Sequence, residues 1–235
     1  MTATPLRLDH LVVSARTLEE GVQYVADTLG ASPAGGGAHP LMRTHNRLLG
    51  LWGGTYLEVI AIDPGARGAG TTASPSRARL FALDDAEVQA RLEKGPYLSH
   101  WVVRVEPPRN LERWRAQFPQ RIPDLVPMTR GNLSWQLSVP LDGAFPNWRG
   151  AGDGILPSLI QWDTPRHPSQ TLADTGIALH KLIAFHPQAP LVREQLAWLG
   201  ANHLITVEDA LSPALAAQFE TPSGTRSLGA PRTLV

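Results

Sequence analysis

Residues 8–15 read LDHLVVSA, and residues 98–105 read LSHWVVRV. Each stretch is rich in β-branched residues, is apolar on both faces and has a histidine in third position, which predicts a strand inside a sheet. A helix-like stretch follows each one, at residues 17–29 and at residues 110–118. The same strand–helix unit therefore occurs twice, about 90 positions apart.

The first unit continues as three strands. Thr17, with Glu20 three residues later, predicts a capped helix start, and Gly30 predicts its end. After a loop rich in Gly and Pro at residues 32–40, the sequence predicts these strands: a short one near residues 38–42, then residues 43–52 and 55–62, with the two-residue turn Gly53-Gly54 between the last two. The predicted order is β-α-β-β-β.

Two later stretches repeat this pattern. Residues 130–139 (RGNLSWQLSV) correspond to residues 44–53 (THNRLLGLWG), and residues 156–163 (LPSLIQWD) correspond to residues 56–63 (YLEVIAID). This alignment pairs Asn132 with Asn46, and Ser158 with Glu58. It leaves residues 140–155 as an insertion, which we expect at the rim of a pocket.

The repeat predicts an α+β fold, in which paired βαβββ modules form a cup-shaped mixed sheet and a partial βαββ unit follows at the C-terminal end. We expect one globular domain with this division: a first module at residues 1–64, a connector with a short helix at residues 65–97, a second module at residues 98–165, and the partial third unit with a tail at residues 166–235. The small-residue stretch 65–76 and a helix capped by Asp84 or Asp85 make up the connector. The tail from residue 223 is predicted to fray.

Composition excludes several classes of protein. With 235 residues, 43% of them apolar, and 21 basic residues against 21 acidic ones, the chain is neither disordered nor a nucleic-acid binder by bulk charge. It contains no cysteine, which excludes thiol catalysis and iron–sulfur clusters and favours a cytoplasmic location. No stretch approaches the ~18 apolar residues of a membrane span, so we expect no membrane partner.

Three side chains stand out on the predicted strands. His10 and His100 occupy equivalent positions in the repeat, and Glu58 interrupts an otherwise apolar strand. If the modules pair about a pseudo-twofold axis, these groups converge, and two imidazoles with one carboxylate are a recognised set of ligands for a divalent metal. The alternatives are core histidines bonded to their neighbours, and a salt bridge from Glu58 to Arg104.

The motifs carrying these residues resemble the glyoxalase-like domains of the vicinal oxygen chelate superfamily, over residues 8–165. They are DHLVVSA with His10, GGGAH with His39, THNRLLGL with His45 and Asn46, TYLEVIAIDP with Glu58, and SHWVVRV with His100. The resemblance implies paired modules and a divalent metal held by a His or Gln on each first strand and a Glu on each fourth strand. His10, Glu58 and His100 match three of these positions, and Ser158 occupies the fourth.

The resemblance favours a metal-dependent lyase, isomerase or dioxygenase that uses Zn, Mn, Fe or Ni and acts on a small oxygen-chelating substrate. Glu58 would then be both ligand and catalytic base. The expected substrate contacts are His39, Arg43, His45, Asn46, Arg104 and, as a lid in the insertion, Trp148.

Two other hypotheses stay open: a metal-free protein that binds or sequesters a small molecule, and a dimerisation scaffold, which would make the chain a homodimer. His167, beside a turn, is assigned no role.

Overall fold

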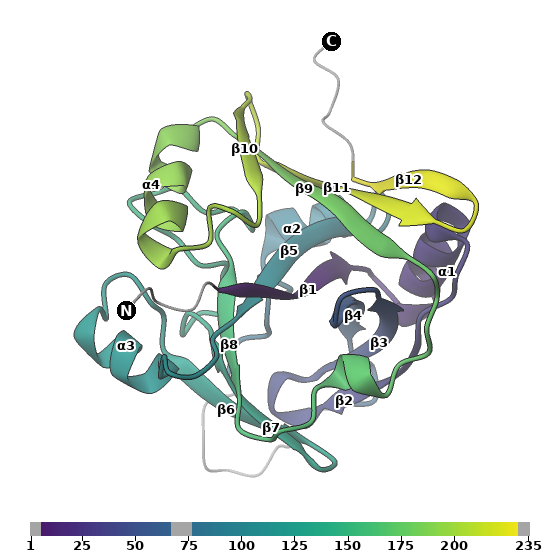
Figure 1. The fold of residues 1–235 in the computed structure, drawn as a ribbon, viewed down its shortest axis with the longest axis horizontal. Helices are drawn as coiled ribbons and strands as arrows, with labels where there is room; N and C mark the ends of the chain where they lie inside the picture. Colours follow the sequence, from purple (N-terminus) through teal and green to yellow (C-terminus); the bar gives the residue numbers. More distant parts are fainter. Residues whose placement is uncertain (1–5, 67–76, 230–235) are drawn as a thin grey trace.

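The computed structural model describes residues 6–66 and 77–229, in which two βαβββ repeats and a third unit follow one another along the chain (Figure 1). The first repeat contains β1 (Arg7–Ser14), α1 (Leu18–Leu29), β2 (Ala34–His39), β3 (Thr44–Leu51) and β4 (Thr55–Ile62). The second contains β5 (Tyr97–Arg104), α3 (Leu111–Gln117), β6 (Leu125–Arg130), β7 (Leu133–Ser138) and β8 (Ser158–Trp162). The third unit contains β9 (Ala178–His186), α4 (Ala189–Leu199), β10 (Thr206–Asp209), β11 (Ala214–Thr221) and β12 (Gly224–Leu228). Helix α2 (Ala86–Leu92) lies in the connector, and short 3-10 helices span Pro40–Met42 and Pro168–Gln170.

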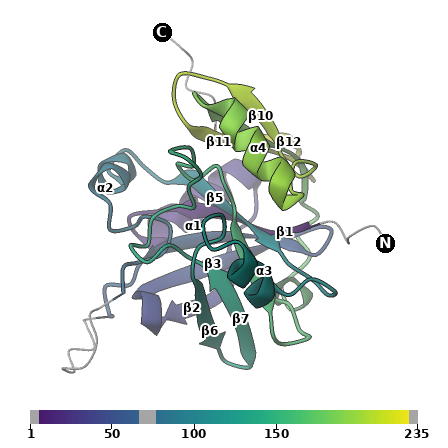
Figure 2. The same cartoon turned by 90° about the vertical axis from the view of Figure 1, so that its left-hand side faces the viewer.

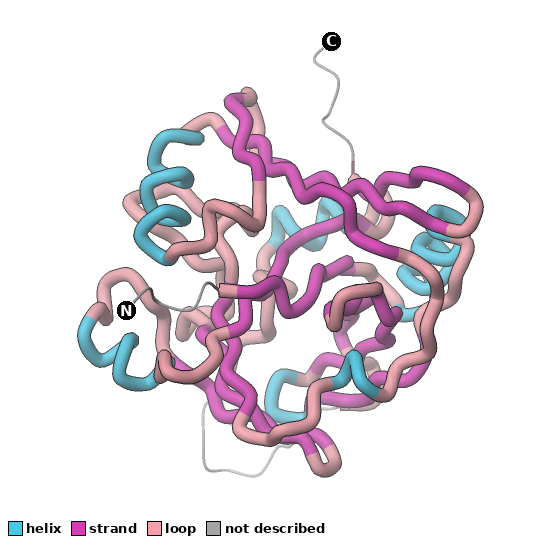
Figure 3. The backbone as a smooth tube through the Cα atoms, in the orientation of Figure 1, coloured by secondary structure: helices cyan, strands magenta, loops and turns pink. Residues whose placement is uncertain are grey.

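Both repeats contribute to one eight-stranded sheet, in the order β2-β3-β4-β1-β5-β8-β7-β6. The antiparallel pair β1–β5 joins the repeats, and each of these strands has a parallel neighbour within its own repeat, β4 or β8. The edge strands β2 and β6 contact each other, so the sheet curls into a cup (Figure 3). The predicted pair of modules and the mixed sheet are confirmed.

The third unit forms a separate four-stranded sheet, in the order β10-β9-β11-β12. Figure 2 shows it with α4 at one side of the large sheet. Its buried residues, such as Leu182, Leu196 and Phe219, share one core with the outward-facing residues of β1 and β4. No helix within the described ranges is long and apolar enough to cross a membrane.

Local signals in the first repeat act as the sequence predicts. The Thr17 hydroxyl accepts a hydrogen bond from the backbone N–H of Glu20, and Gly30 ends α1 in a left-handed conformation. Gly53 and Gly54 have φ values of 87° and 80° in the turn between β3 and β4. A positive φ is accessible to glycine without the steric penalty that a Cβ atom imposes, so these residues define the hairpin.

Pairing of the strands corrects one alignment between the repeats. Asn46 pairs with Ile60 on β4, whereas Leu137 pairs with Ile160 on β8, so Leu137 is the counterpart of Asn46. Asn132, the predicted counterpart, lies in the turn between β6 and β7. The sequence predicts one strand across this turn, because similarity between two short stretches of sequence does not determine their hydrogen-bonded register.

Two segments differ from their predicted structure. The loop predicted at residues 32–40 contains β2, a glycine-rich edge strand, and the strand predicted near residues 38–42 is largely a 3-10 helix. The predicted frayed tail instead forms β12, which pairs with β11 and contacts α1. Residues 67–76 of the connector and residues 230–235 of the tail lie outside the described residues.

The connector fills part of the cup. Leu80, Phe81 and Leu83 pack against the inward-facing Val102 and other apolar residues of the sheet. Phe81 and Ala82 both have left-handed backbones, with φ of 56° and 54°, and the N–H of Ala82 donates to the Gly143 carbonyl. Such conformations cost roughly 1–2 kcal/mol for each residue with a Cβ atom. The strained turn directs the connector's apolar side chains into the second half of the cup.

A substitution at Gly36 tests whether the backbone of β2 requires glycine. A Cβ atom at this position would lie 2.2 Å from the Asn46 carbonyl oxygen, whereas one at Gly53, whose φ of +87° is close to the +84° of Gly36, would meet nothing within 4 Å. We predict that Gly53→Ala lowers the free energy of unfolding by about 1–2 kcal/mol, and that Gly36→Ala costs a further ~1–3 kcal/mol because the backbone must move. Urea unfolding measures both, and equal losses would contradict the assigned contact.

Candidate functional site

A β-bulge at Asp9 builds the first part of the site. On the antiparallel pair β1–β5, Leu8 pairs with Val103 and His10 pairs with Val102, which leaves Asp9 as the extra residue. Strict alternation would send Asp9 and His10 to opposite faces of the sheet, but a bulge redirects side chains. The Asp9 carboxylate thus reaches the imidazole of His10 and accepts a hydrogen bond of 2.8 Å from Nδ1.

Asp9 is fully buried and has four cationic or N–H partners. His10 binds Oδ1 of this carboxylate, whereas Oδ2 accepts from the indole N–H of Trp162 at 2.9 Å and from His167 Nε2 at 3.1 Å. Arg104 Nε lies 3.1 Å from the same oxygen, within ion-pair distance although its N–H is not aligned with it. Burial alone would raise the pKa of Asp9, but the bonds and charges of His10 and His167 outweigh burial and hold that pKa well below its usual range.

Glu58 faces the other side of the His10 ring. Its Oε2 lies 3.5 Å from His10 Nε2, and its Oε1 accepts a 2.5 Å hydrogen bond from the Asn46 amide. Burial alone would lower the pKa of His10, but Asp9 and Glu58 raise this pKa to about 9. Burial alone would raise the pKa of Glu58, but His10, His39 and Asn46 lower that pKa to about 2. At neutral pH the site therefore holds an imidazolium between two carboxylates.

His100, the counterpart of His10, lies outside this ion-pair cluster. Its Nδ1 donates to the Gly154 carbonyl at 2.9 Å, and its Nε2 accepts from the backbone N–H of Ser158 at 3.1 Å. The rings of Phe81 and Phe145 lie 5.0 and 5.2 Å from the imidazole centroid. Burial lowers the pKa of His100 to about 3, so the ring is neutral. Among the described residues, no hydrogen bond or ion pair joins His100 to His10 or Glu58, and residues of the connector and the insertion pack against its ring.

Apart from His10 and His100, the two repeats differ at the polar positions of the site. Strand pairing makes Ser158 the counterpart of Glu58 and Leu137 the counterpart of Asn46. By the same pairing, His39 corresponds to Met128 of β6. Equivalent backbone positions thus carry hydrogen-bonding groups in the first repeat and mainly apolar groups in the second.

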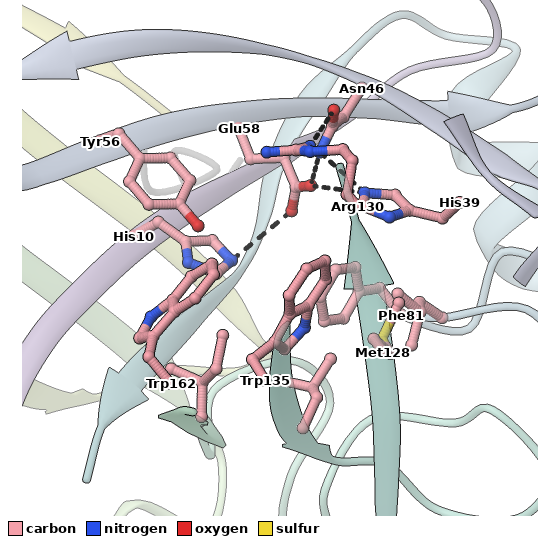
Figure 4. Close-up of a pocket in the computed structure, with 13 residues that line it drawn as sticks. His10, His39, Asn46, Tyr56, Glu58, Phe81, Met128, Arg130, Trp135 and Trp162 are labelled. Atoms are coloured by element: carbon pink, nitrogen blue, oxygen red, sulfur yellow. Dashed lines mark hydrogen bonds and ion pairs between the residues drawn. The ribbon is translucent and has the colours of Figure 1, made fainter. Parts of the chain in front are cut away.

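A pocket lies between these two sets of side chains (Figure 4). One wall is polar or amphipathic, formed by His10, His39, Asn46, Tyr56 and Glu58 of the first repeat. The opposite wall is formed by Leu80 and Phe81 of the connector and by Met128, Trp135, Leu137, Ile160 and Trp162 of the second repeat, with Arg130 also in the lining. About 400 Å³ of space lies between the walls when the part open to solvent is counted, but only about 30 Å³ of it admits the centre of a water-sized sphere, so a ring-sized ligand requires side chains of the lining to change rotamer.

Asn46 links the polar wall to Arg130. Its Oδ1 accepts from the backbone N–H of Gly37 and from Arg130 Nη1, both at 3.0 Å. Its Nδ2 donates to Glu58 and to His39 Nε2, the latter at 3.0 Å. All four contacts agree on one orientation of the amide, so Asn46 is fixed in place.

Four of the other predicted substrate contacts lie away from the pocket lining. His45 neighbours Asn46 on β3 and therefore points to the opposite face of the sheet. Arg43 donates to the Arg77 carbonyl at 2.9 Å, and Arg104 binds Asp9 rather than Glu58. Trp148 packs against the outer core, with the Arg121 guanidinium 4.0 Å from the centre of its ring.

For several residues of the site, the sequence predicts no functional role. Asp9 is an acidic residue inside an apolar strand, which is a signal, but strict alternation places it on the face opposite His10. His167 is positioned by the segment between β8 and β9, which no local pattern ties to β1. Arg130, Trp135 and Trp162 become neighbours of Glu58 only when the sheet curls.

Comparisons with known proteins agree with this architecture. The model of the family described as glyoxalase-like domain matches residues 8–200, and the chain belongs to that family, within the vicinal oxygen chelate superfamily. A hypothetical protein from Staphylococcus aureus has 16% sequence identity and a TM-score of 0.59, over 89% of this chain and 88% of that one, and shares the fold. Methylmalonyl-CoA epimerase from Mycobacterium tuberculosis has 17% identity and a TM-score of 0.40, over 69% of this chain and 91% of that one. No curated protein matches the chain.

The donor atoms expected for a divalent metal are engaged elsewhere. A histidine ligand must offer an unprotonated nitrogen. His100 Nε2 already accepts from Ser158, and His10 lies between Asp9 and Glu58, whose charges raise its pKa. Among residues 6–66 and 77–229, no three His, Asp or Glu side chains are arranged to hold a metal ion. These residues therefore do not fit the metal that the family resemblance implies.

The two histidines predict a stability maximum near pH 6.5. The raised pKa of His10, about 9 against 6.5 for an exposed histidine, contributes stability fully below pH 6.5 and loses it as the pH rises toward 9. His100, with a pKa of about 3, acts in the opposite sense: as the pH falls below 6.5, the unfolded chain gains a proton that the folded chain excludes. In urea unfolding from pH 4.5 to 9.5, His10→Gln should flatten the alkaline slope and His100→Gln the slope between pH 6.5 and 4.5. An alkaline slope that is unchanged in His10→Gln would contradict the ion-pair assignment.

Removing the charge of Asp9 should affect folding strongly. Asp9→Asn leaves the buried cations of His10 and Arg104 without their carboxylate, for which we predict a loss of about 3–5 kcal/mol in the free energy of unfolding. The control is Asp209→Asn, because Asp209 pairs with Arg193 at the surface and its side chain is 69% exposed; that change should cost less than ~1 kcal/mol. Chemical denaturation compares the variants, and similar small losses would show that Asp9 does not organise the site.

Proposed function

We propose that this member of the glyoxalase-like family is a metal-independent protein that binds a small molecule in the pocket between its two repeats. The observation that carries the proposal is the division of the pocket into a polar wall and an apolar, aromatic wall. Pockets for small molecules commonly combine extensive apolar lining with a few fixed polar groups that orient the ligand. Here Asn46 and its partners supply the fixed groups.

The protonation states favour binding over acid–base catalysis. A general acid or base works best when its pKa lies near the working pH. Glu58, with a pKa of about 2, and His10, with a pKa of about 9, both keep their charges at neutral pH. Their mutual ion pair therefore serves to position the polar wall, because neither group exchanges a proton readily at that pH.

The aromatic side chains suit a flat ligand. The rings of Trp135 and Trp162 lie 5.1 Å apart at 41°, and both line the pocket. On the other side, Tyr56 stacks on the His10 imidazole with 4.6 Å between centroids. Aromatic faces favour offset stacking or edge contacts with another ring. A planar body with one polar end matches the two walls better than a polyhydroxylated molecule does.

The alternative is the metal-dependent lyase, isomerase or dioxygenase reaction expected from the family resemblance. The two hypotheses predict different metal contents and different responses to a chelator. We predict that protein expressed with added Zn, Mn, Fe and Ni contains far less than one metal ion per chain, and that fragments from a small aromatic and aliphatic library bind equally well with and without EDTA. Elemental analysis and calorimetric titration measure these properties.

Matched variants test whether the fragments bind in the pocket. Leu137→Trp fills the apolar wall and should abolish fragment binding, whereas Leu211→Trp changes a residue that is 79% exposed and should leave it intact. Circular dichroism checks folding, and Met128→Phe serves as the pocket-filling variant if Leu137→Trp does not fold. One metal ion per chain that is lost in Glu58→Ala would contradict the proposal and support the metal-dependent reaction.

A further inference from the structure

The charge of Arg130 identifies the chemical class of the ligand. We propose that the pocket recognises a small flat molecule carrying a single carboxylate, which pairs with the Arg130 guanidinium and accepts a hydrogen bond from His39 Nδ1–H. This inference rests on the proposed function, because it specifies what the same pocket binds. Three independent observations support it: an uncompensated cation, an unpaired buried donor and an aromatic wall.

Arg130 has no carboxylate partner within the described part of the chain. Its Nη1 donates to the neutral amide oxygen of Asn46, and its other N–H groups make no hydrogen bond to the described residues. Among the charged groups in and around the pocket, His10 pairs with Asp9 and Glu58, and Arg104 pairs with Asp9 and Glu106. Arg130 is the cation of the pocket lining that pairs with no carboxylate of the described residues. A single anionic group on the ligand balances it, and a planar guanidinium matches carboxylate geometry.

The hydrogen bonds of Asn46 also fix the proton on His39. Asn46 Oδ1 accepts from Gly37 and Arg130, so Asn46 Nδ2 must be the donor to His39 Nε2. His39 Nε2 is then the acceptor, and the neutral ring carries its proton on Nδ1. Burial, with the nearby charge of Arg130, lowers the pKa of His39, in agreement with a neutral ring.

His39 Nδ1 has no hydrogen-bond partner among the described residues, although the side chain is only 5% exposed. An unpaired buried donor destabilises the folded protein, so a ligand oxygen at this position would recover free energy. The His39 ring lines the pocket, and Phe81 and Trp135 lie near it (Figure 4). The centroids of His39 and Trp135 are 5.9 Å apart and their planes are nearly perpendicular.

Arg130 reaches the polar wall from the opposite edge of the sheet. It ends β6, one of the two edge strands, and its stem lies over Gly37 of the other edge strand, where a Cβ atom would be 3.3 Å from the Arg130 Cδ. The absence of a side chain at Gly37 lets the long arginine stem cross from the second repeat to the polar wall of the first. The carboxylate site therefore forms only where the two edges of the cup meet.

Calorimetric titration of the full chain with defined probes tests the inference. The flat carboxylates are benzoate, salicylate and phenylpyruvate, and the controls are benzamide, which is flat but neutral, and cyclohexanecarboxylate, which is charged but not flat. We expect at least one flat carboxylate to bind more tightly than both controls. Arg130→Gln should weaken its binding by on the order of ten- to a hundredfold, because a hydrogen bond to a charged group contributes about 1.5–3 kcal/mol, and should leave benzamide unaffected.

Arg113→Gln is the matched control, since Arg113 is exposed on α3 and does not line this pocket. It should bind every probe as the unaltered chain does, and the unfolding midpoint of each variant verifies that it is folded. The inference is overturned if benzamide binds as tightly as benzoate, if Arg130→Gln changes nothing, or if none of the carboxylates binds while neutral library fragments do. That last result leaves the proposed function standing, whereas the absence of binding by any small molecule overturns both.

Discussion

The site depends on one buried carboxylate. Asp9 is fully enclosed, and a charged group without water is stable only when its partners compensate for lost hydration. Those partners come from different parts of the chain: His10 on the same strand, Arg104 on β5, Trp162 on β8 and His167 between β8 and β9. Because Asp9 holds one edge of the His10 ring, the opposite edge is aimed at Glu58. The bulge that turns Asp9 inward is therefore the geometric origin of the polar wall.

The duplicated sheet supports two different half-sites. Register places Glu58 and Ser158 at equivalent points, and His10 and His100 likewise. The first repeat surrounds its histidine with carboxylates and an amide, so the ring is charged. The second repeat, the connector and the insertion surround their histidine with Phe81, Phe145 and backbone groups, so the ring is neutral. His10 and His100 thus occupy equivalent backbone positions, and their rings differ in charge because their neighbours differ.

Much of the fold could be predicted from the sequence, since its signals are local. Strand and helix order, the Thr17 cap and the Gly53-Gly54 turn all depend on residues close together in the chain. The details that define the site depend on register instead. A single extra residue at Asp9 reverses the face it occupies, and the turn at Asn132 shifts a whole strand relative to its counterpart.

Charge and enclosure were harder still to predict from the sequence. Whether His100 is a ligand or a core residue depends on Phe81, which belongs to the connector and reaches the cup through two left-handed residues that have Cβ atoms. Whether Arg130 contacts Asn46 depends on how far the sheet curls. Neither property leaves a periodic pattern, because each arises from contacts between segments that are distant in sequence.

The separation of the pocket into walls from different repeats has an evolutionary consequence. The polar side chains also join neighbouring strands of the sheet, so a change at Asp9, His10 or Glu58 alters both stability and the polar wall of the pocket. The side chains at Met128, Trp135 and Leu137 are apolar and can exchange volume with modest energetic effect. The lining from the second repeat can therefore vary in sequence, while the ion pairs of the first repeat restrict what its own lining can become.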